Sequence, residues 1–426
     1  MLSREDNELL TRVGPGTPTG ALLRCFWQPF ALSSELPHAD SDPIRVRLLG
    51  EDLVAFRDSN GTVGLLQNNC PHRGASLFFG RNEEAGLRCV YHGWKFAADG
   101  TCVDMPNEPA DSDFKQKVRA TAYPTVDRGG VVWAYLGSAP APALPDLEWT
   151  RVPESHRIVT KRVQFCSYLQ NVEGEVDSSH VSFLHSKQNG AADSAGIKAD
   201  PGATLPDYMA RDRAPRFFVL PTEYGMLIGA RRDAEADSYY WRITQFLMPS
   251  YTMIPSPVGS PVSFTGATPI DDHTMMGFTV TWHPDRPLSD GEAAQIRSWL
   301  GVHTEVDPRT FVPLRNRDND YLIDRELQRS RRSYTGIRGI REEDLAVQES
   351  MGLVCDRTVE HLGSADLAVI GMRRRLLEAV HALEERGEVP YEARNHAAYH
   401  VRSAALVLPR EVEWHTGAAS ALAATR

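Results

Sequence analysis

The chain has 426 residues, of which 42% are hydrophobic and 24% are charged. This is the composition of a globular protein of two or three domains, and it excludes collagen-like, coiled-coil and wholly disordered chains. A formal net charge of -10 argues against a nucleic-acid-binding protein, which needs a basic face.

The sequence contains neither a predicted membrane helix nor a predicted signal peptide. No apolar run approaches the roughly 20 residues of a membrane helix, so we expect no membrane span. The N-terminal stretch MLSREDNELL has acids where a signal peptide has a basic and then an apolar region. We therefore expect a cytoplasmic protein.

The first third of the chain predicts an N-terminal arm followed by a small all-β domain. Residues 1–43 should form a short helix from Asp6 to Val13, a Gly-Pro turn and an extended arm. Residues 44–137 contain short β-rich runs separated by Gly, Asn and Asp turns, namely IRVRLLG, DLVAF, VGLLQ, GLRCVY and VVWAYL. The Pro-rich residues 138–150 are expected to be a linker.

Two cysteines and two histidines in this β domain form the first candidate metal site. Cys70 and His72 make a C-x-H motif, and Cys89 and His92 make a C-x2-H motif, with sixteen residues between them. Two thiolates and two imidazoles can close a tetrahedral zinc site. They can also bind a Rieske [2Fe–2S] cluster, in which one iron takes both thiolates and the other takes both imidazoles.

The residues around these motifs favour the cluster over zinc. Gly74 and Gly93 allow backbone N–H groups to approach closely, as the bridging sulfides of a cluster would need. The remaining cysteines have no comparable partners, and we interpret them as packing residues: Cys25, Cys102, Cys166 and Cys355.

Residues 151–426 predict a second domain of mixed helix and strand. A helix is expected from Ser167 to His185, followed by a loop from Asn189 to Leu205 without periodicity. Strands are expected at RFFVL, GMLIGARR, SYYWRITQFLM, VSFTGATPI and MMGFTVTWH, enough for a large antiparallel sheet. A late helix should run from Ala365 to Arg386, with Ser364 as N-cap, Gly387 as stop, and a face packed on the sheet made of Leu367, Ile370, Leu377, Val380 and Leu383.

The stretch NVEGEVDSSHVSFLH contains the second candidate metal site. On a helix Glu173, Asp177 and His180 share a face, because they are spaced i,i+4 and i,i+3. His180 and His185 are turned apart by about 140° at about 100° per residue. Both imidazoles can therefore reach one metal only if the helix bulges or ends between them, and we predict a distortion there.

Two imidazoles and one carboxylate make the facial triad of non-haem Fe(II), which leaves positions open for O2 and substrate. The third ligand must come from elsewhere in the chain. Asp344 in the segment REEDLAVQES is the best candidate, with Glu343 and Asp356 as rivals. Although an H-x4-H pair alone is weak support, the one-electron relay expected in the same chain needs an acceptor for its electrons.

With these two candidate sites, the sequence resembles the catalytic α subunits of Rieske non-haem iron oxygenases, and most of all their phthalate dioxygenase branch. The matching stretches are CPHRGASLFFG with LRCVYHGWKF, EGEVDSSHVSFLH, the late block beginning DLAVQESMGLVCDR, and the opening MLSREDNELLTRVGPGTP. The similarity thus covers most of the chain. It implies an α+β chain with an N-terminal all-β Rieske [2Fe-2S] domain and a helix-grip (START-like) catalytic domain built on an antiparallel sheet.

The resemblance also implies a role for each site residue. Cys70, His72, Cys89 and His92 would hold the cluster, and His180, His185 and Asp344 would hold the mononuclear iron. Asp177 would be a bridging carboxylate that links the iron ligand of one subunit to the cluster histidine of its neighbour in a homotrimer. A carboxylate bonded to two metal-ligating imidazoles would orient both.

The function implied is that of the terminal oxygenase component of an aromatic ring-hydroxylating enzyme. O2 would be the oxidant, and NAD(P)H would supply electrons through a separate flavin- or ferredoxin-type reductase. The chain itself has no GxGxxG motif after a strand and no further cysteine cluster, so it shows no flavin or nicotinamide site of its own.

The family analogy favours a carboxylated aromatic substrate, such as a phthalate or a benzoate. An arginine could bind its carboxylate, and Arg216 and Arg242 are the preferred candidates. Most of the nearby arginines should be surface charges, and strand alternation allows at most one of Arg231 and Arg232 to point inward.

Two other functions stay open at this point. A Rieske monooxygenase or an O- or N-demethylase would use the same irons, because the substrate atom nearest the iron decides the outcome. The alternative from another class is a non-catalytic electron-transfer or metal-binding module, perhaps with zinc at the Cys/His site. That module would bind no mononuclear iron.

Overall fold

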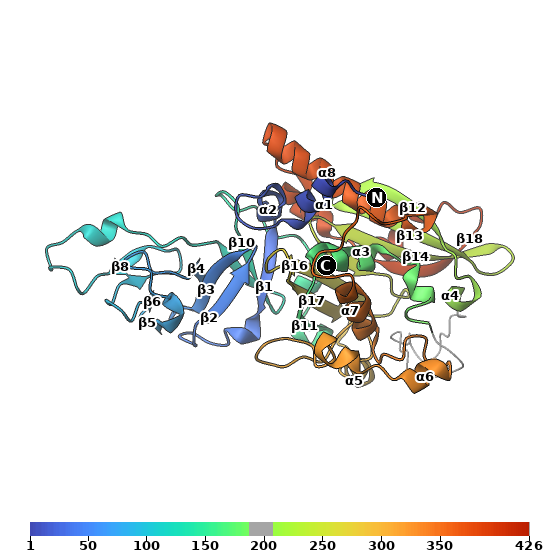
Figure 1. Ribbon diagram of the computed structural model, residues 1–426, viewed down its shortest axis with the longest axis horizontal. Coiled ribbons are helices and arrows are strands. Elements are labelled where there is room, and N and C mark those ends of the chain that lie inside the picture. Colours follow the sequence, from blue (N-terminus) through green and yellow to red (C-terminus); the bar gives the residue numbers. More distant parts are fainter. Residues whose placement is uncertain (187–207, 426) are drawn as a thin grey trace.

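The computed structural model describes residues 1–186 and 208–425 (Figure 1). The loop predicted from 189 to 205 lies outside these residues. Small sheets form one end of the molecule, and a large sheet with its helices forms the other. This α+β arrangement confirms the predicted fold class.

The N-terminal end is built from three small antiparallel sheets. Their strands belong to the predicted β-rich region, except for β1 in the arm before it. The first sheet has the order β1-β10-β9, with β1 (Trp27–Leu32), β9 (Thr125–Arg128) and β10 (Val131–Tyr135). The second contains β2 (Ile44–Leu48), β3 (Glu51–Arg57) and β4 (Val63–Gln67), and the third contains β5 (Arg81–Glu83), β6 (Gly86–Arg88), β7 (Lys95–Phe96) and β8 (Cys102–Asp104).

Two short helices precede these sheets. Helix α1 (Arg4–Thr11) begins earlier than predicted, because the Ser3 side chain caps it by accepting from the Asp6 N–H at 3.0 Å. Helix α2 (Pro18–Arg24) replaces part of the predicted extended arm, so that prediction was wrong there. The signal was in the sequence, since Thr17 as N-cap followed by Pro18 in the first turn is a common helix start.

The other end of the molecule is organised by an eight-stranded antiparallel sheet. All five predicted strands are present, and three further ones, β11, β15 and β18, join them. The order is β11 (Arg157–Gln164), β17 (Met275–Trp282), β16 (Val262–Pro269), β15 (Tyr251–Ile254), β14 (Ser238–Leu247), β13 (Gly225–Asp233) and β12 (Arg216–Thr222), and β18 (Ala404–Pro409) also pairs with β14.

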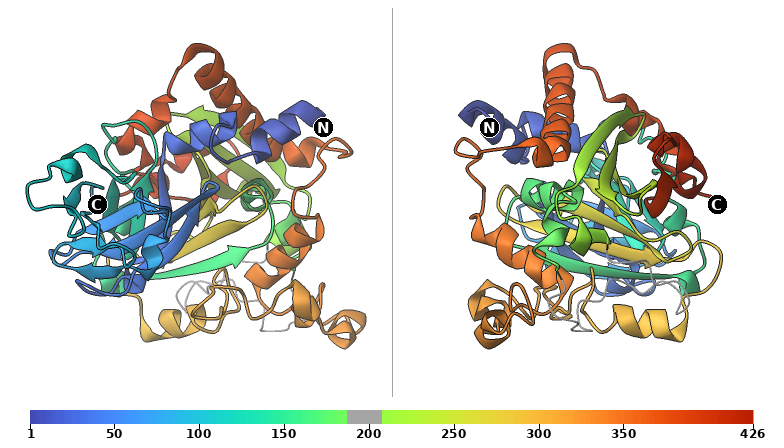
Figure 2. Two further views of the ribbon diagram at one scale, coloured as in Figure 1. Left: turned by 60° about the vertical axis from the view of Figure 1, so that its left-hand side comes forward. Right: turned by 90° about the vertical axis from the view of Figure 1, so that its right-hand side faces the viewer.

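Three helices lie near one face of this sheet and matter for the site. Helix α3 (Tyr168–Val176) contacts β14, β15 and β16, and α7 (Ile340–Ser350) contacts α3. Helix α8 (Leu367–Arg386) packs on β12 and β13. Figures 1 and 2 show α8 at the opposite side of the molecule from α5 (Asp290–Ile296) and α6 (Arg325–Arg329). The remaining short helices are α4 (Tyr208–Arg211), α9 (Tyr391–Arg394), α10 (Trp414–Gly417) and α11 (Ala419–Leu422).

The late helix α8 ends as predicted, and its packing face matches the predicted one only in part. Gly387 stops it in the left-handed conformation at φ 64°, whereas the N-cap position is Asp366 rather than Ser364. Leu367 is 43% exposed, and the buried positions include Ala368, Val369, Met372, Leu376, Ala379 and Val380. Of the predicted residues, Val380 is buried, and Leu377 and Leu383 are partly buried against the core. Small residues complete the face, and Gly371 lies beside Met226 and Val219 of the sheet.

Candidate metal centres

The four candidate cluster ligands lie in two loops with the same backbone pattern. In the first, the Cys70 N–H donates to the Ala75 carbonyl at 2.8 Å, and the Gly74 N–H donates back to the Cys70 carbonyl at 2.9 Å. In the second, Cys89 and Gly93 take the same two roles, with the bond from Cys89 going to the Trp94 carbonyl. Both glycines have positive φ, at 76° and 78°, which explains why a side chain is disfavoured at each turn.

The side chains of these loops form one thiol pair and one imidazole pair. Cys70 and Cys89 are buried together in one apolar cluster, and the rings of His72 and His92 lie 4.5 Å apart between centroids. Within residues 1–186 and 208–425, these four donors do not form a group close enough for a single ion. Two thiols on one side and two imidazoles on the other match the two irons of a Rieske cluster better than one zinc.

Neighbouring residues hold and tune this pocket. The Trp94 ring stacks on His72 with centroids 4.3 Å apart, and its indole N–H donates to Asn107 at 2.7 Å, which fixes the stack. Burial raises the pKa of the Cys70 thiol to about 11, and the adjacent Cys89 adds to the shift. Bound metal would therefore have to displace the thiol protons. Of the remaining cysteines, Cys102 and Cys166 are buried, and Cys25 and Cys355 are partly buried.

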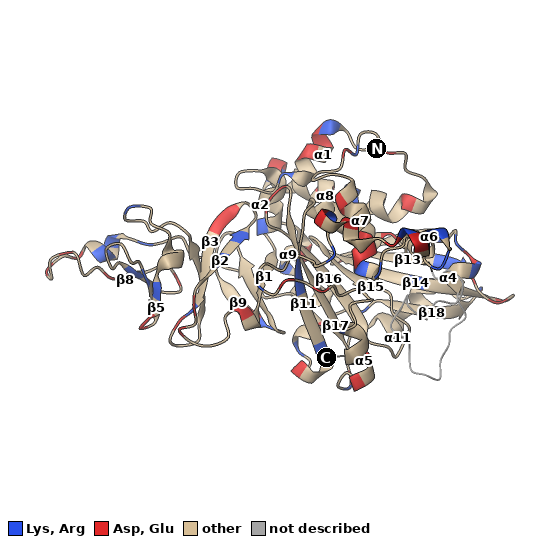
Figure 3. Cartoon of the chain, turned by 60° about the horizontal axis from the view of Figure 1, so that its bottom comes forward, with Lys and Arg blue, Asp and Glu red and all other residues tan. Residues whose placement is uncertain are grey.

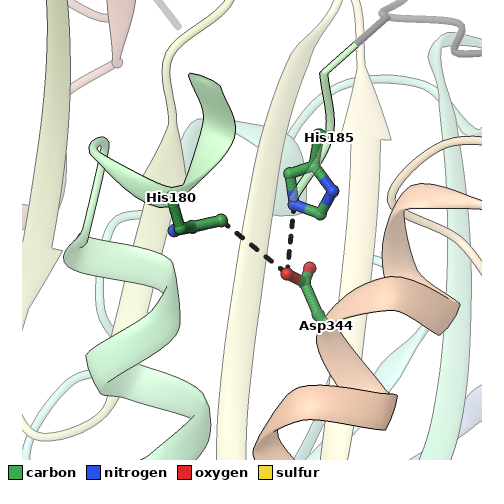
Figure 4. Close-up of side chains that lie close together, drawn as sticks. All are labelled: His180, His185 and Asp344. Atoms are coloured by element: carbon green, nitrogen blue, oxygen red, sulfur yellow. Dashed lines mark ion pairs between the residues drawn. The ribbon is translucent and has the colours of Figure 1, made fainter. Parts of the chain in front are cut away.

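The second site joins two chain segments that are far apart in sequence. His180 lies in a short 3-10 turn after α3, His185 follows it, and Asp344 lies on α7. One carboxylate oxygen of Asp344, Oδ1, faces both rings, at 3.1 Å from His185 Nε2 and 3.7 Å from His180 Nε2 (Figure 4). One donor atom from each residue lies within 4.8 Å of the other two, so the three residues fit a single metal ion.

The helix carrying this motif ends earlier than predicted. Helix α3 stops at Val176, so the distortion lies before both histidines rather than between them. The Asp177 carboxylate accepts from the backbone N–H groups of Ser179, at 2.6 Å, and His180, at 3.2 Å. An aspartate that bonds to the backbone ahead of it competes with the helix, and this explains the early end.

Glu173 does not share the metal face that the helical spacing predicted. It forms ion pairs with Arg357, at 2.7 Å, and Arg373, at 2.6 Å, and both of these arginines are buried. Glu173 thus ties α3 to α8 and to the segment before α8. Because the helix ends at Val176, a face extrapolated beyond that residue has no meaning.

The two rivals of Asp344 lie elsewhere. Glu343 accepts from His185 Nδ1 at 2.7 Å, on the side of the ring that faces away from Asp344. Asp356 bonds to Thr358 and lies outside the group. The structure therefore brings Asp344, and neither rival, to the two imidazoles.

Each histidine of this group has a carboxylate at Nδ1, which leaves Nε2 facing the centre. Asp177 is 3.2 Å from His180 Nδ1, and Glu343 is 2.7 Å from His185 Nδ1. Burial opposes a charge on His185, but Asp344 and Glu343 outweigh it and raise its pKa to about 9. Such carboxylates fix the tautomer and the orientation of metal-binding imidazoles.

The candidate substrate arginines separate onto two faces of the sheet. Arg216 pairs with Arg231 across β12 and β13, and Arg231 pairs with Trp241, so these side chains share one face. Arg232 and Arg242 point to the other face, where both approach Ser178, two residues before His180. The expectation for Arg216 therefore needs correction, because Arg216 is exposed on the face away from the histidines.

Sequence reasoning missed Glu175 and Arg341, which lie directly behind Asp344. Arg341 bonds to Glu175 at 2.6 Å and lies 3.5 Å from the Oδ2 atom of Asp344. The available signal was weak: Arg341 precedes Asp344 by three residues, a spacing that places both on one helix face. Figure 3 shows how closely charges of both signs gather on α7.

Two domain families match the sequence. Residues 26–124 match the Rieske [2Fe-2S] domain, and residues 134–425 match the family described as LigXa C-terminal domain like. The oxygenase subunit of 3-chlorobenzoate-3,4-dioxygenase from Comamonas testosteroni is 40% identical over 98% of this chain and 98% of its own length. The oxygenase subunit of phthalate 4,5-dioxygenase from Pseudomonas putida is 40% identical over 90% of this chain and 87% of its own length.

A solved structure has the same fold at much lower identity. Dicamba monooxygenase bound to dicamba superposes with a TM-score of 0.59 at 19% identity, covering 85% of this chain and 98% of that one.

Among the described helices, none has the length and apolar character that crossing a membrane requires.

Proposed function

Because this chain belongs to the Rieske non-haem iron oxygenases, in the branch of the phthalate and 3-chlorobenzoate dioxygenases, we propose that it hydroxylates a carboxylated aromatic ring. In this proposal O2 is the oxidant, and NAD(P)H supplies electrons through a separate reductase. The observation that supports it most is that one chain has two paired Cys/His loops and a separate His-His-Asp group.

We propose the ligand roles residue by residue. Cys70, His72, Cys89 and His92 would hold the cluster, and His180, His185 and Asp344 would hold the mononuclear iron. The cluster would supply electrons one at a time, and the iron would supply O2 activation. We further propose that residues 44–137 and 151–426 form separate domains. We also propose that the chain forms a homotrimer in which Asp177 would join neighbouring subunits.

Neighbouring side chains fix the orientation of His180 and His185. Asp177 and Glu343 each accept from the Nδ1 side of one histidine, so that both Nε2 atoms turn inward. Arg232 holds the turn around His180, because it donates to the Ser178 carbonyl at 2.7 Å and to the Ser182 hydroxyl at 3.2 Å. The loop geometry is therefore set before a metal or substrate binds.

Arg242 is the proposed anchor for the substrate carboxylate. Its neighbour Arg232 is buried, and each of its guanidinium nitrogens donates to the protein. Arg242 is half-buried and donates from Nε to the Ser178 hydroxyl at 3.2 Å, while its Nη groups have no hydrogen-bond acceptor within residues 1–186 and 208–425. A guanidinium with unused donors beside the iron group suits a carboxylate.

The test is steady-state kinetics with a benzoate or phthalate substrate and its neutral amide. Arg242→Met should raise KM for the acid by about 10- to 100-fold, the loss expected for a charge-assisted hydrogen bond. The variant should have little effect on the amide and none on iron content. Arg216→Met, on the opposite face of the sheet, is the matched control. Equal KM values for the acid in both variants and the wild type would remove Arg242 from this role.

Product analysis under labelled O2 separates dioxygenation from its nearest alternative. Two labelled oxygens in a cis-diol are expected, whereas one labelled oxygen or a demethylated product would establish a monooxygenase or demethylase. Both outcomes use the same ligand set, because the substrate atom nearest the iron determines the product. Equilibrium sedimentation of the purified chain tests the proposed trimer.

A further inference from the structure

The two carboxylate oxygens of Asp344 have different partners. Oδ1 faces the Nε2 atoms of His185 and His180, at 3.1 and 3.7 Å, and Oδ2 faces Nη1 of Arg341 at 3.5 Å. Figure 4 shows both histidine contacts meeting at the same oxygen. One oxygen is thus directed to the metal position and the other to a cation behind it.

Two hydrogen bonds fix the buried side chain of Arg341. Its Nη1 donates to Glu175 Oε1 at 2.6 Å, its Nε donates to the Val302 carbonyl at 3.2 Å, and its side chain is 1% exposed. Glu175 lies in the last turn of α3, while Arg341 and Asp344 lie in α7. The pair therefore links the helix that precedes the iron histidines to the helix that carries their carboxylate partner.

Helices α3 and α7 approach each other closely enough to keep this link short. A Cβ atom at Gly174 would lie 2.5 Å from the Nε2 atom of Gln348, so the Gln348 side chain of α7 packs directly on the backbone of α3. Gln348 also bonds to Gln164 at 2.7 Å, which anchors α7 to strand β11. The distance from Glu175 to Asp344 is consequently set by rigid elements.

A second buried arginine, Arg162, lies near Arg341 and also depends on the charge of Glu175. Arg162 on β11 is 2% exposed and lies flat over Gly277, where a Cβ would be 2.4 Å from the guanidinium. Arg162 and Arg341 repel each other, and Glu175 and Asp344 are the anions that offset them. If Glu175 loses its charge, Asp344 becomes the main anion near both guanidiniums, and Arg341 should compete with the metal for it.

We propose that Glu175 and Arg341 are positioning residues that hold Oδ2 of Asp344 away from the iron and reserve Oδ1 for it. Asp344 would then offer the metal one oxygen, and the open position of such a site would be available to O2 or substrate. This inference rests on the proposed role of His180, His185 and Asp344 as iron ligands.

The test measures iron binding in the full-length holoprotein rather than turnover. Glu175→Gln should weaken mononuclear Fe(II) binding by about 10- to 100-fold in a chelator competition, the usual effect of losing a residue that orients a metal ligand. It should also change the EPR line shape of the Fe(II)–nitric oxide adduct. The EPR signal of the reduced cluster should stay unchanged, which reports an intact fold.

Glu342→Gln is the matched control. Glu342 is a buried carboxylate on the same helix as Asp344, but it accepts from Thr304 at 2.6 Å instead of from Arg341. The control should bind iron within about 2-fold of the wild type, since Glu342 forms no hydrogen bond to Asp344 or to Arg341 within the described residues. In Arg341→Met, adding Glu175→Gln should weaken binding no further, because the route from Glu175 to Asp344 is already cut.

Three results would overturn the inference. They are wild-type iron affinity in Glu175→Gln, an equal loss in Glu342→Gln, or additive losses in the double variant. If Glu175→Gln does not fold, Arg341→Lys keeps the buried charge without the guanidinium fork, and it should show the same change in the nitric oxide adduct. Failure of the proposed function gives a different result, because His180→Ala would then keep mononuclear iron at wild-type affinity.

Discussion

His303 should make the folded protein sensitive to mild acid. Its ring is 2% exposed, and its two nitrogens lie 2.8 Å from the Thr160 hydroxyl and 2.9 Å from the Thr281 hydroxyl. Neutral imidazole satisfies both hydroxyls with one donor and one acceptor. Burial lowers the pKa of His303 to about 3, and the nearby guanidiniums of Arg341 and Arg162 add to the shift.

The size of the effect follows from proton linkage. In the unfolded chain a histidine titrates near pH 6.5, so between about pH 6.5 and about pH 3 the unfolded state binds a proton that the folded state does not. The contribution of His303 to the free energy of unfolding is therefore complete above about pH 6.5 and decreases as the pH falls. Lowering the pH from about 7.5 to about 5 should cost about 2 kcal/mol of the free energy of unfolding.

The assay is denaturant unfolding of the wild type and His303→Gln at both pH values. The glutamine amide keeps one donor and one acceptor and does not titrate, so the variant should lose about 2 kcal/mol less than the wild type on acidification. His38→Gln, at an exposed histidine, controls for the general effect of pH. Equal acid losses in the wild type and His303→Gln would refute the reasoning.

Two further predictions concern the buried carboxylates around α3 and α7. Glu343→Gln should weaken Fe(II) binding by about 10- to 100-fold, because the amide no longer holds a charge beside His185 Nδ1; unchanged affinity in a chelator titration would contradict this. Glu173→Ala should lower the free energy of unfolding by about 3–5 kcal/mol, since it leaves the buried Arg357 and Arg373 without their shared carboxylate. A thermal midpoint close to that of the wild type, measured at fixed metal content, would show that the two guanidiniums find other partners.

The cluster loops could be predicted from the sequence because each is local. A cysteine, a histidine and a glycine within a few residues specify one tight turn, and the two turns repeat the same backbone bonds. Five strands of the large sheet were predictable for a similar reason, since the length and the β-branched and aromatic content of a strand are local properties. Helix α2 was missed although its start at Thr17 and Pro18 is also local.

The arrangement of His180, His185 and Asp344 could not be derived without the tertiary structure. Glu343 and Asp344 are neighbours in the chain, but on α7 they point in directions about 100° apart, and only the packing of α7 against α3 decides which one faces the Nε2 atoms of both imidazoles. The face of the sheet likewise separates Arg242 from Arg216, because strand register determines which arginine lies beside the histidines.

The sequence by itself thus determined the family and the two kinds of metal site, and it predicted candidate ligands for both, because ligand types at short spacing encode local turns. Only the tertiary structure decided where α3 ends, which carboxylate of α7 completes the group, and that Glu175 and Arg341 lie behind it. Those choices depend on contacts between segments far apart in the chain, and the free energy of such contacts comes from packing that no local pattern records.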